Sequence, residues 1–529
     1  MKKNKPTHRI IVFFVIFSTS FTISQNKEDF LSLDRYLSWE NIEAPQISPD
    51  GKKIIYSRKW VDSVNDTWEN TLWIMDSDGS KNRFLVDGSS AKWSSDNKKI
   101  AFLSKGKLNK TQIFVRWMDN EGSTSQISRL NNPPSNISWS PDGKYIAFQM
   151  LVDSQDDLSW KIKMPSKPKN AKWTENPKII ESLNYKRDRI GFSPKGYRHL
   201  FIISAQGGVP KQITYGDWHH DSYMWLKDGK NIVFQSLRIK DAEYEWRESE
   251  LYKINIKSKQ IIQLTKRKGP DRGPIPSPNG KYIAYTGHDW TNDTYIEEKL
   301  YIMNIDGSNH KQIAQEMGRS PRNIIWSEDS KGIYFTAAIR GTNNLYYASL
   351  NGKKTTITRG SHMLTINDVS NSGLAVGTLS SPKIPKNLIS LNLKNKSQIK
   401  TLFTSNESHL SEVKLGDIEE IWYNSKDDFN IQGWIVKPPN FDSKKKYPLI
   451  LRIHGGPHSM YNFGFDFKNQ DHAANGYVVL YTNPRGSSGY GSNFGNAIKN
   501  AYPDKDYDDL MAGVDEVISK GYIDEKNLF

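Results

Sequence analysis

Four residues near the carboxyl end of the chain have the types and spacing that acyl-transfer chemistry needs. His454, Gly455, Gly456 and Pro457 directly follow an apolar run, Tyr447–Ile453. Two adjacent glycines leave backbone N–H groups without side-chain cover, so these donors can reach the oxygen of a tetrahedral intermediate. The segment therefore predicts an oxyanion-binding loop, in which His454 either acts as a general base or shapes the loop.

A second glycine-rich segment follows the next apolar run. Tyr477–Tyr481 (YVVLY) leads into Asn483–Gly491 (NPRGSSGYG). Arg485 in this segment either orders the neighbouring loop or binds substrate, and the ordering role is the favoured interpretation. Ser487 and Ser488 lie among glycines, but neither has the Gly-x-Ser-x-Gly spacing of a nucleophile elbow. No other serine of the 529 residues has that spacing either.

Strands and helices alternate around these two segments, which predicts an α/β architecture. Both apolar runs read as buried strands, Tyr447–Ile453 as a central one. If the sheet is incomplete, we expect its exposed edge to include the Tyr477–Tyr481 strand. The other expected elements are an antiparallel pair at Ile418–Tyr423 and Phe429–Lys437, helices near Asn469–Ala474 and Asp506–Lys520, and a strand beginning in Ile523–Phe529.

The residues before this part contain a repeated turn followed by alternating apolar residues. Asp-Gly and Asn-Gly supply the positive-φ residue of a tight hairpin, and the alternation predicts a half-buried strand. Turn anchors at 50, 96, 142, 228, 279, 329 and 372 are separated by 46, 46, 86, 51, 50 and 43 residues. The copies are SPDG at 48–51, SDN at 95–97, SPDG at 140–143, KDG at 227–229, PNG at 278–280, EDS at 328–330 and NSG at 371–373.

Each turn is paired with one later strand that opens on an aliphatic–aromatic pair. These openings are Leu72-Trp73, Ile113-Phe114, Leu200-Phe201, Leu251-Tyr252, Leu300-Tyr301, Leu345-Tyr346 and the degenerate Leu388-Ile389. Four-stranded units at this period stack radially, so the pattern predicts an all-β, seven-bladed β-propeller over residues 25–410. The long gap between turns contains one later strand only, which indicates an insertion near 151–198.

The N-terminus has the pattern of a secretory signal. Four basic residues in the first nine precede the apolar run Ile10–Phe17 and a zone of small residues that ends at Ser24. Cleavage after Ser24 would expose Gln25 and leave a secreted or periplasmic protein without a stable membrane span. The alternative is an uncleaved anchor, which the short run disfavours because a span needs roughly 20 apolar residues.

Composition excludes several other classes of function. The chain has no cysteine, which excludes disulfides, zinc ribbons and a cysteine nucleophile. The net charge of +15 is spread through turns rather than arranged in stripes with aromatics, so nucleic acid is not an expected partner. His219-His220-Asp221 could bind a metal, but a polar loop between blades is the favoured interpretation, and we expect neither metal nor cofactor.

Three segments together resemble the prolyl oligopeptidase family of serine peptidases. They are HGGP at 454–457, YTNPRGSSGYG at 481–491 and DYDDLMAGVDEVISKGYIDEKNLF at 506–529. The resemblance covers roughly residues 30–529 and is closest to the bacterial acylaminoacyl-peptidase and dipeptidyl-peptidase-like branch. It implies an N-terminal propeller, a C-terminal α/β-hydrolase domain and short peptides as substrates, with the propeller excluding folded proteins.

The resemblance also implies roles for the site residues. It assigns the oxyanion donor to the Gly456 amide, with Gly455 as the alternative. We expect His454, Pro457 and Arg485 to shape the loop; for His454 the reason is that the base of α/β hydrolases follows the nucleophile and the acid along the chain. The resemblance places the nucleophile just after the strand that begins at Leu528-Phe529. We therefore expect the catalytic Ser, Asp and His beyond Phe529, a hydrolase part at 415–529 that stops before the elbow, and no activity in the chain as given.

Two other functions remain open on the sequence. A non-catalytic propeller could recruit a partner in the periplasm, although such a module would end near residue 410. An α/β-hydrolase esterase shares the HGG loop, although the propeller ahead of the loop favours a peptidase. The preference between exopeptidase and oligopeptidase action is not determined by these residues.

Overall fold

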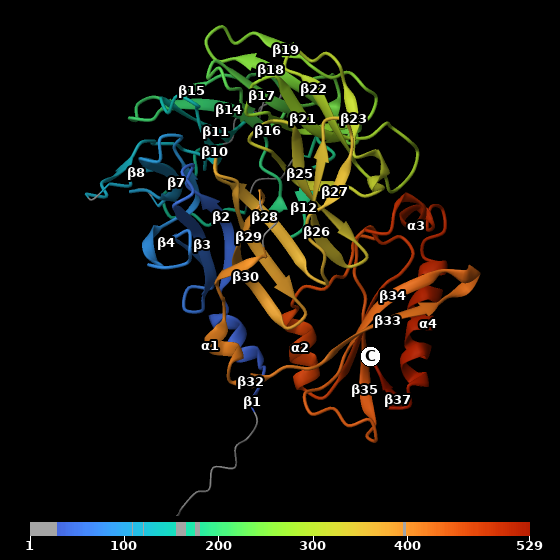
Figure 1. The fold of residues 1–529 in the computed structure, drawn as a ribbon. Coiled ribbons are helices and arrows are strands. Elements are labelled where there is room, and N and C mark those ends of the chain that lie inside the picture. The colour runs from blue at the N-terminus through green and yellow to red at the C-terminus, as the bar shows by residue number, and fades with distance from the viewer. Residues whose placement is uncertain (1–28, 108, 120, 155–164, 175–179, 395–397) are drawn as a thin grey trace, which may run out of the picture.

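The computed structural model describes residues 29–529 apart from 108, 120, 155–164, 175–179 and 395–397. A ring of four-stranded sheets lies beside a smaller α/β portion that contains the C-terminus (Figure 1). The expected signal peptide at 1–24 lies outside the described residues. Among the residues that are described, no helix is both long and apolar enough to span a bilayer.

The described part of the ring contains seven four-stranded units, which confirms the predicted propeller. The first strands of neighbouring units contact one another, so they surround the central axis. The first three units, from first to fourth strand, are β2 (Asn41–Ile47), β3 (Lys53–Asp62), β4 (Thr67–Asp76), β5 (Arg83–Asp87); β6 (Ser89–Trp93), β7 (Lys99–Lys105), β8 (Thr111–Trp117), β9 (Thr124–Gln126); and β10 (Ser135–Trp139), β11 (Tyr145–Val152), β14 (Tyr197–Ser204), β15 (Lys211–Gln212).

The remaining units follow the same order. The sixth and seventh share one sheet because β26 and β28 pair at Asn343 and Met363. Their strands are β16 (His220–Trp225), β17 (Asn231–Ser236), β18 (Glu250–Asn255), β19 (Ile261–Gln263); β20 (Asp271–Pro276), β21 (Tyr282–Gly287), β22 (Lys299–Asn304), β23 (Lys311–Ile313); β24 (Pro321–Trp326), β25 (Gly332–Ile339), β26 (Thr342–Ser349), β27 (Lys354–Thr356); and β28 (Met363–Val369), β29 (Leu374–Ser381), β30 (Ile384–Asn392), β31 (Lys400–Phe403).

The repeated turn joins the first and second strands of the blades. In the third blade, Ser140 Oγ donates to Asp142 Oδ1 over 2.7 Å and accepts from the N–H of Tyr145 over 2.9 Å. Gly143 has a φ of 68°, a left-handed conformation that glycine adopts without a steric penalty. The serine and aspartate side chains therefore satisfy the turn backbone locally and set the register of the strand that follows.

The ring closes through contacts between its first and last blades. Ile42 and Tyr56 of the first blade pack with Val376 of the seventh in one apolar cluster. The N–H of Ile47 donates to Asp368 Oδ2 over 3.0 Å across the same boundary. Burial of these apolar side chains between blades, rather than a shared strand, holds the ring shut.

The predicted insertion interrupts the third blade between β11 and β14. Its described residues include the two-stranded hairpin β12 (Lys186–Arg187) and β13 (Gly191–Phe192). The N–H of Leu183 donates to the Glu243 carboxylate over 2.8 Å, beside the short helix η2 (Ala242–Tyr244) of the fourth blade. The insertion therefore lies against the neighbouring blade.

The expected polar loop at His219–Asp221 is wrong, because His220 and Asp221 begin the innermost strand of the fourth blade, β16. The His220 side chain is fully buried and packs on His199, with ring centroids 5.0 Å apart. Its Nε2 lies 2.7 Å from Arg238 Nη1. Burial lowers the pKa of His220 to about 3, so this side chain is a neutral hydrogen-bonding group of the propeller interior.

The α/β portion contains one five-stranded sheet in the order β33-β34-β36-β35-β37, with helices on both faces. Its strands agree closely with the expected ones, whereas the short helix α3 was not expected. The elements are β33 (Ile418–Asn424), η4 (Lys426–Asp428), β34 (Asn430–Val436), β35 (Tyr447–Arg452), α2 (Phe467–Ala474), β36 (Val478–Asn483), α3 (Ser492–Asn496), α4 (Lys505–Ser519) and β37 (Ile523–Leu528).

The strand β36 is central, so the expectation of Tyr477–Tyr481 at a sheet edge is wrong. β36 pairs with β34 on one side and with β35 on the other, and the edges are β33 and β37. Val478 and Leu480 pack in the cluster that contains α4 residues, whereas Val479 and Tyr481 pack toward Ala473 of α2. A strand with alternate side chains buried on opposite faces is apolar throughout, as YVVLY is.

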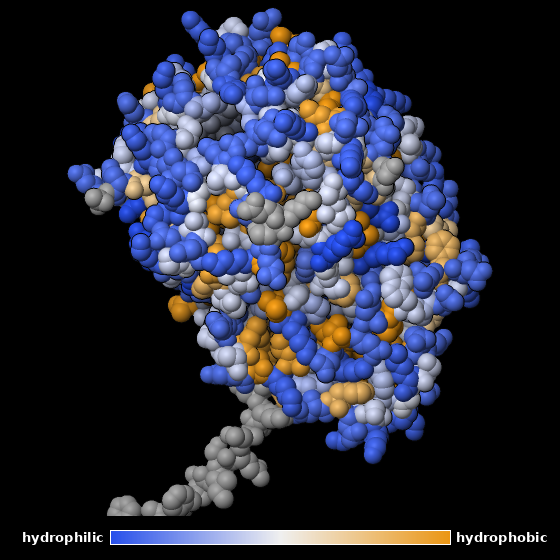
Figure 2. Space-filling view, in the orientation of Figure 1, coloured by the Kyte–Doolittle hydropathy of each residue, from blue (hydrophilic) through white to orange (hydrophobic). Residues whose placement is uncertain are grey.

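The α/β portion contacts the ring through the connections between second and third strands. The N–H of Arg340 donates to the Gly489 carbonyl over 3.1 Å, and the N–H of Phe463 donates to the Gly341 carbonyl over 2.8 Å. Trp39, which follows the short helix η1 (Leu33–Ser38), stacks on Phe465 at 5.4 Å. The face in Figure 2 is mostly hydrophilic over the ring, and apolar side chains gather in its lower half near this junction.

Short elements lead from the ring into the α/β sheet. The helix α1 (Glu407–Leu410) follows the seventh blade. The next strand, β32 (Val413–Lys414), pairs in parallel with β1 (Asp29–Phe30), so the first described residues lie beside the link between the two portions.

Candidate active site

The predicted oxyanion loop lies at the carboxyl end of β35, an inner strand of the sheet. Gly455 and Gly456 are both exposed, and Gly456 has a φ of 137°. Within the part of the chain that the structure describes, no hydrogen bond engages the N–H of either glycine. A Cβ on Gly456 would lie 3.0 Å from the His458 nitrogen, whereas a Cβ on Gly455 would meet nothing within 4 Å. Two free backbone donors are therefore available here to a developing oxyanion.

His454 connects the oxyanion loop to the loop that follows β36. Its Nε2 lies 3.1 Å from Ser487 Oγ and its Nδ1 lies 3.1 Å from the Gly455 carbonyl. Burial is the main cause that lowers the pKa of His454. The imidazole thus lies within hydrogen-bond distance of both loops, where it can set their spacing.

The approach of His454 to Ser487 resembles a nucleophile–base pair, but Ser487 has the wrong surroundings. Its side chain is fully buried, and its hydroxyl donates to the Pro484 carbonyl over 2.7 Å. The single hydroxyl proton is therefore directed away from His454, and substrate cannot reach the oxygen. Ser487 is a structural hydrogen-bonding residue of this loop.

Pro457 and His458 complete the oxyanion loop. The Gly456–Pro457 peptide bond is cis. His458 Nδ1 lies 2.8 Å from the Gly486 carbonyl, which gives the loop a second contact with the segment after β36. The ring of His458 packs against Tyr295 of the propeller, with centroids 5.1 Å apart.

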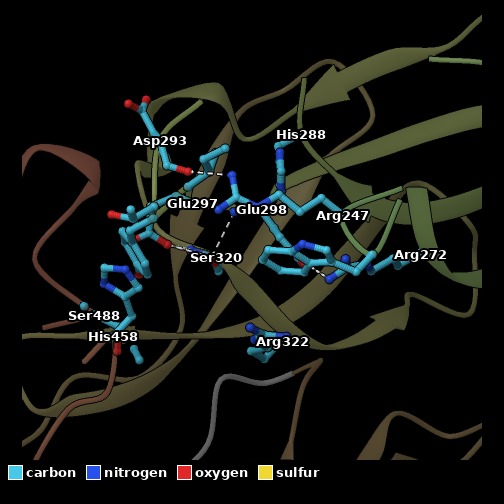
Figure 3. Close-up of a pocket in the computed structure, with 16 residues that line it drawn as sticks. Arg247, Arg272, His288, Asp293, Glu297, Glu298, Ser320, Arg322, His458 and Ser488 are labelled. Atoms are coloured by element: carbon cyan, nitrogen blue, oxygen red, sulfur yellow. Dashed lines mark hydrogen bonds and ion pairs between the residues drawn. The ribbon is translucent and has the colours of Figure 1, made fainter. Parts of the chain in front are cut away.

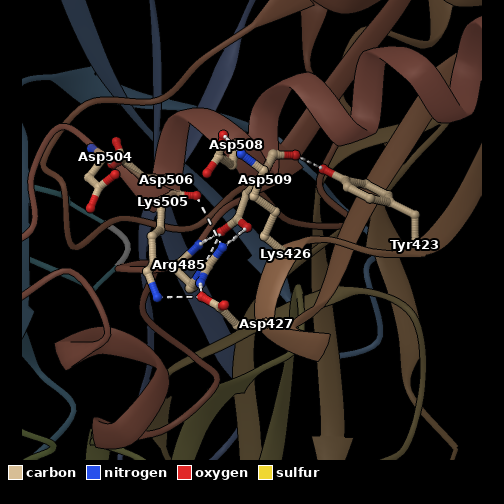
Figure 4. Close-up of polar contacts among 9 residues, drawn as sticks. All are labelled: Tyr423, Lys426, Asp427, Arg485, Asp504, Lys505, Asp506, Asp508 and Asp509. Atoms are coloured by element: carbon tan, nitrogen blue, oxygen red, sulfur yellow. Dashed lines mark hydrogen bonds and ion pairs between the residues drawn. The ribbon is translucent and has the colours of Figure 1, made fainter.

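Arg485 is buried in an ion-pair network (Figure 4). Its side chain is 2% exposed, and its Nη2 donates to Asp509 Oδ1 over 2.7 Å, where Asp509 is itself fully buried. The Arg485 backbone N–H donates to the same carboxylate over 2.8 Å, and Nη1 reaches Asp427 over 3.2 Å. The guanidinium also lies 4.5 Å from the centre of the Phe429 ring. These contacts join the loop after β36 to α4, and they direct the cation away from the cavity described next.

A cavity of about 370 Å³ lies where the propeller meets the oxyanion loop (Figure 3). The α/β portion contributes His458, Ser488 and Gly489 to its wall. The propeller contributes charged side chains and one histidine from the fourth, fifth and sixth blades, which are Arg247, Arg272, His288, Asp293, Glu297, Glu298 and Arg322. The cavity volume is in the range of small-molecule sites, and a short peptide fits that size.

Most of the cations in this wall have partners on the propeller. Arg272 Nη1 lies 3.4 Å from Glu298 Oε1, and Arg247 Nη1 donates to the Asp293 carbonyl over 2.8 Å. Arg247 therefore bonds to a neutral carbonyl rather than to a carboxylate. These contacts fix the wall before any ligand arrives.

Glu297 has a different environment from the other acids of the cavity. Its Oε2 accepts from the N–H of Ser320 over 2.7 Å and from the Ser320 hydroxyl over 2.6 Å. Its Oε1 accepts from the Tyr295 hydroxyl over 2.9 Å. Among the described residues no cation lies within ion-pair distance of this carboxylate, although it is only 8% exposed. A buried carboxylate that has only neutral hydrogen-bond donors as partners can still accept a hydrogen bond from a cationic group.

The sequence did not predict these propeller residues. Glu297 and Glu298 lie just before the predicted strand opening at Leu300-Tyr301, in a connection that faces the oxyanion loop. The sequence does show two adjacent acidic residues before this strand. It does not show that they lie near Gly456, because that proximity depends on contacts between segments almost 160 residues apart in the chain. Of the predicted site residues, His454, Gly455, Gly456 and Pro457 form one continuous loop after β35. Arg485 lies in the loop after β36, paired with Asp509 of α4, and is not part of the cavity wall.

Comparison with protein families gives two matches. Residues 463–529 match the family described as the prolyl oligopeptidase family, and residues 150–293 match the dipeptidyl peptidase IV N-terminal region. The first match covers the loop after β36 and all of α4. The second covers the whole fourth blade and parts of the third and fifth, and it includes Arg247 and Arg272 of the cavity.

Known relatives extend over nearly the whole chain. The chain is 28% identical to an uncharacterized peptidase, YuxL, of Bacillus subtilis over 92% of this chain and 76% of that protein. It is 26% identical to dipeptidyl-peptidase 5 of Porphyromonas gingivalis over 98% of this chain and 78% of that protein. The solved Pyrococcus horikoshii acylaminoacyl peptidase matches with a TM-score of 0.78 at 20% identity, over 94% of this chain and 74% of that one.

Proposed function

We propose that this chain, which matches the prolyl oligopeptidase family over residues 463–529 and the dipeptidyl peptidase IV N-terminal region over residues 150–293, is an exported serine peptidase that removes short units from peptides with a free amino terminus. The observation that supports this proposal is one cavity that joins a carboxylate pair, Glu297 and Glu298, to the oxyanion loop. The names of the dipeptidyl-peptidase relatives agree with this chemistry. The esterase and partner-recruiting alternatives do not require carboxylates at that place.

The proposed mechanism gives the described residues two tasks. The α-ammonium group of the peptide binds to the Glu297 carboxylate, whose neutral partners leave its charge uncompensated. The carbonyl of the scissile bond then points to the N–H of Gly456, with Gly455 beside it. The developing negative charge on that oxygen is stabilised by these preformed donors while an acyl-enzyme forms.

The nucleophile of this reaction is not found among residues 1–529. None of their serines has the Gly-x-Ser-x-Gly spacing, and the hydroxyl of Ser487 is buried and already donating. We propose that a polypeptide of residues 1–529 alone binds substrate without hydrolysing it. A fluorophosphonate probe should label no serine of this polypeptide, and stoichiometric labelling of any of its serines would overturn the proposal.

Amine recognition can be tested on the full-length product of the gene. Dipeptidyl substrates would be compared with the same substrates carrying an N-acetyl group. Glu297→Gln should lower kcat/KM for the free amine by about 10- to 100-fold, the range for loss of a charged hydrogen bond, and should leave the acetylated substrate unchanged. Glu328→Gln, on an exposed propeller turn, is the matched control. Equal loss on both substrates would contradict the proposed role of Glu297.

Export can be tested separately on the native protein. The basic start and the Ile10–Phe17 run motivate the expectation that the protein of the cell envelope begins near Gln25. N-terminal sequencing of that fraction gives the answer directly. A protein that retains Met1 and stays in the cytosol would contradict export.

A further inference from the structure

Tyr295 of the propeller lies between the carboxylate of the cavity and the oxyanion loop. It belongs to the connection from β21 to β22, in the fifth blade. Its hydroxyl donates to Glu297 Oε1 over 2.9 Å. Its ring packs on His458, with centroids 5.1 Å apart and the ring planes inclined by 38°. One side chain therefore touches both parts of the proposed substrate site.

The α/β portion holds Tyr295 in this position through α3. Asn496 Oδ1 accepts from the N–H of Tyr295 over 3.0 Å and from the N–H of Thr294 over 3.1 Å. Asn496 Nδ2 donates to the Tyr295 carbonyl over 2.6 Å. Gly495 lies against the Tyr295 ring, because a Cβ at Gly495 would come within 2.1 Å of the ring atom Cδ1. Backbone and ring are thus both fixed by the domain that carries the oxyanion loop.

His458 lies between Tyr295 and the segment that presents the Gly456 N–H. It is two residues after Gly456, and a Cβ at Gly456 would lie only 3.0 Å from the His458 nitrogen. On its far side, His458 Nδ1 lies 2.8 Å from the Gly486 carbonyl. His458 is therefore held between the Tyr295 ring and the Gly486 carbonyl, next to the backbone that presents the Gly456 N–H.

We propose that Tyr295 is a positioning residue that sets the oxyanion loop from the propeller side. Its ring positions His458, and its hydroxyl couples that position to the carboxylate of Glu297. The hydroxyl part of the proposal rests on the proposed amine-binding function, whereas the ring part does not. A cross-domain contact of this kind makes the donor geometry depend on correct docking of the propeller.

The ring and the hydroxyl can be separated with two variants of the full-length gene product. Tyr295→Leu removes both, whereas Tyr295→Phe keeps the ring against His458. Tyr295→Leu should lower kcat by about 10-fold on the N-acetylated dipeptidyl substrate with little change in KM, because small misplacement of a donor costs turnover. The loss on the free amine should be a few fold larger, because this variant also removes the hydroxyl that donates to Glu297. Tyr295→Phe should restore kcat on the acetylated substrate and keep a loss of a few fold on the free amine.

The accessibility of His458 gives a readout that does not require turnover. Carbethoxylation of His458 by diethyl pyrocarbonate, followed by mass spectrometry, should be faster in Tyr295→Leu than in the wild type and unchanged in Tyr295→Phe. Tyr145→Leu, on an exposed position of β11, is the control for general loosening of the propeller. Matching thermal midpoints for all variants would show that each one folds.

The outcomes distinguish this inference from the proposed function. Full kcat in Tyr295→Leu, or failure of Tyr295→Phe to restore kcat on the acetylated substrate, would overturn the positioning role. A wild type that cleaves both substrates equally would refute amine recognition and, with it, the hydroxyl coupling. In that case a 10-fold loss in Tyr295→Leu, restored in Tyr295→Phe, would still support the ring part.

Discussion

The propeller and the α/β portion are stabilised in different ways. In the propeller the same short-range hydrogen bond recurs in the turns between first and second strands. It joins the hydroxyl of the serine that opens the turn to the side chain two residues later. The pairs are Ser48/Asp50, Ser94/Asp96, Ser140/Asp142, Ser277/Asn279, Ser327/Asp329 and Ser370/Ser372. Six of the seven blades therefore contain their own copy of the contact, whereas the fourth has Leu226 in place of the serine and Asp228 accepts from the N–H groups of Lys230 and Asn231 instead.

The α/β portion depends on contacts that occur once and join distant segments. Arg485 and Asp509 are an example, since both are buried and connect the loop after β36 to α4. Losing one of several equivalent local hydrogen bonds should lower the stability of the fold only slightly. Breaking a buried ion pair that occurs once should lower it much more, because a buried charge is left without its partner. The comparison indicates that substitutions in the site region have larger effects than chemically similar ones in the ring.

Removal of Asp509 should have the largest effect. Asp509→Ala leaves the Arg485 cation buried without its main partner, which should destabilise the α/β portion by about 3–5 kcal/mol. Hydrogen exchange of the α4 amides measures this opening separately from the propeller. Asp508→Ala, which breaks the pair with the solvent-exposed Lys426, should cost far less, because water screens the attraction between exposed charges. Equal effects of the two variants would contradict the comparison.

Gly456→Ala in the full-length gene product should lower turnover by about 10²-fold, as loss of one oxyanion donor does. The new Cβ would press on the amides of His458 and Ser459, and the φ of 137° disfavours any side chain. Gly455→Ala meets nothing within 4 Å and should cost much less. Gly476→Ala, at another positive φ in open space, controls for backbone strain alone. Unchanged turnover in Gly456→Ala would place the donor elsewhere.

The propeller has a buried charge of its own in Glu250. Burial, together with nearby Asp271 and Glu248, raises the pKa of Glu250 from 4.5 to about 7. The folded state then binds more protons than the unfolded state between these values, so this group's contribution to stability falls as pH rises from about 4.5 through 7. The lowered pKa of His220 has the opposite effect, because its contribution to stability rises with pH up to about 6.5. The effect of Glu250 is therefore measured by comparing a Glu250 variant with the wild type at each pH.

Glu250→Gln removes the titrating group and keeps the shape. Relative to the wild type, its free energy of unfolding should rise by on the order of 2 kcal/mol between pH 5 and pH 8. Urea unfolding at both pH values measures the difference, and Glu121→Gln on the surface is the control. A difference that does not change with pH would show that Glu250 is not a source of this linkage.

A single propeller turn should show the smallest effect. Ser140→Ala removes one of the recurring side-chain contacts and should cost about 1 kcal/mol, the value of one hydrogen bond. Ser80→Ala, in an exposed turn between β4 and β5 with a similar Ser–Asp contact, should cost less than about 0.5 kcal/mol. Equilibrium unfolding of the propeller measures both. A cost of several kcal/mol for Ser140→Ala would show that the turns are not redundant.

Local patterns in the sequence predicted most of the fold. Turn residues with fixed offsets and alternating apolar residues predicted the strands of the ring, because these features act within a few residues. The strand before Gly455 and Gly456 was predicted in the same way, and the role of these glycines in an oxyanion loop stays a prediction. The error at Tyr477–Tyr481 arose because an apolar run indicates burial but does not give its place in the strand order.

The sequence by itself determined the blade turns, the alternation of strands and helices, and the residue types of the oxyanion loop. Only the tertiary structure showed that Tyr295 of the fifth blade packs on His458 of that loop and that Glu297 lines the same cavity as His458. It also showed that Arg485 is buried on Asp509 and that Ser487 is enclosed. The physical reason is the distance along the chain over which each kind of interaction acts. Turn chemistry and periodicity are set by neighbours along the chain, whereas a site between two portions is set by which surfaces pack when the whole chain has folded.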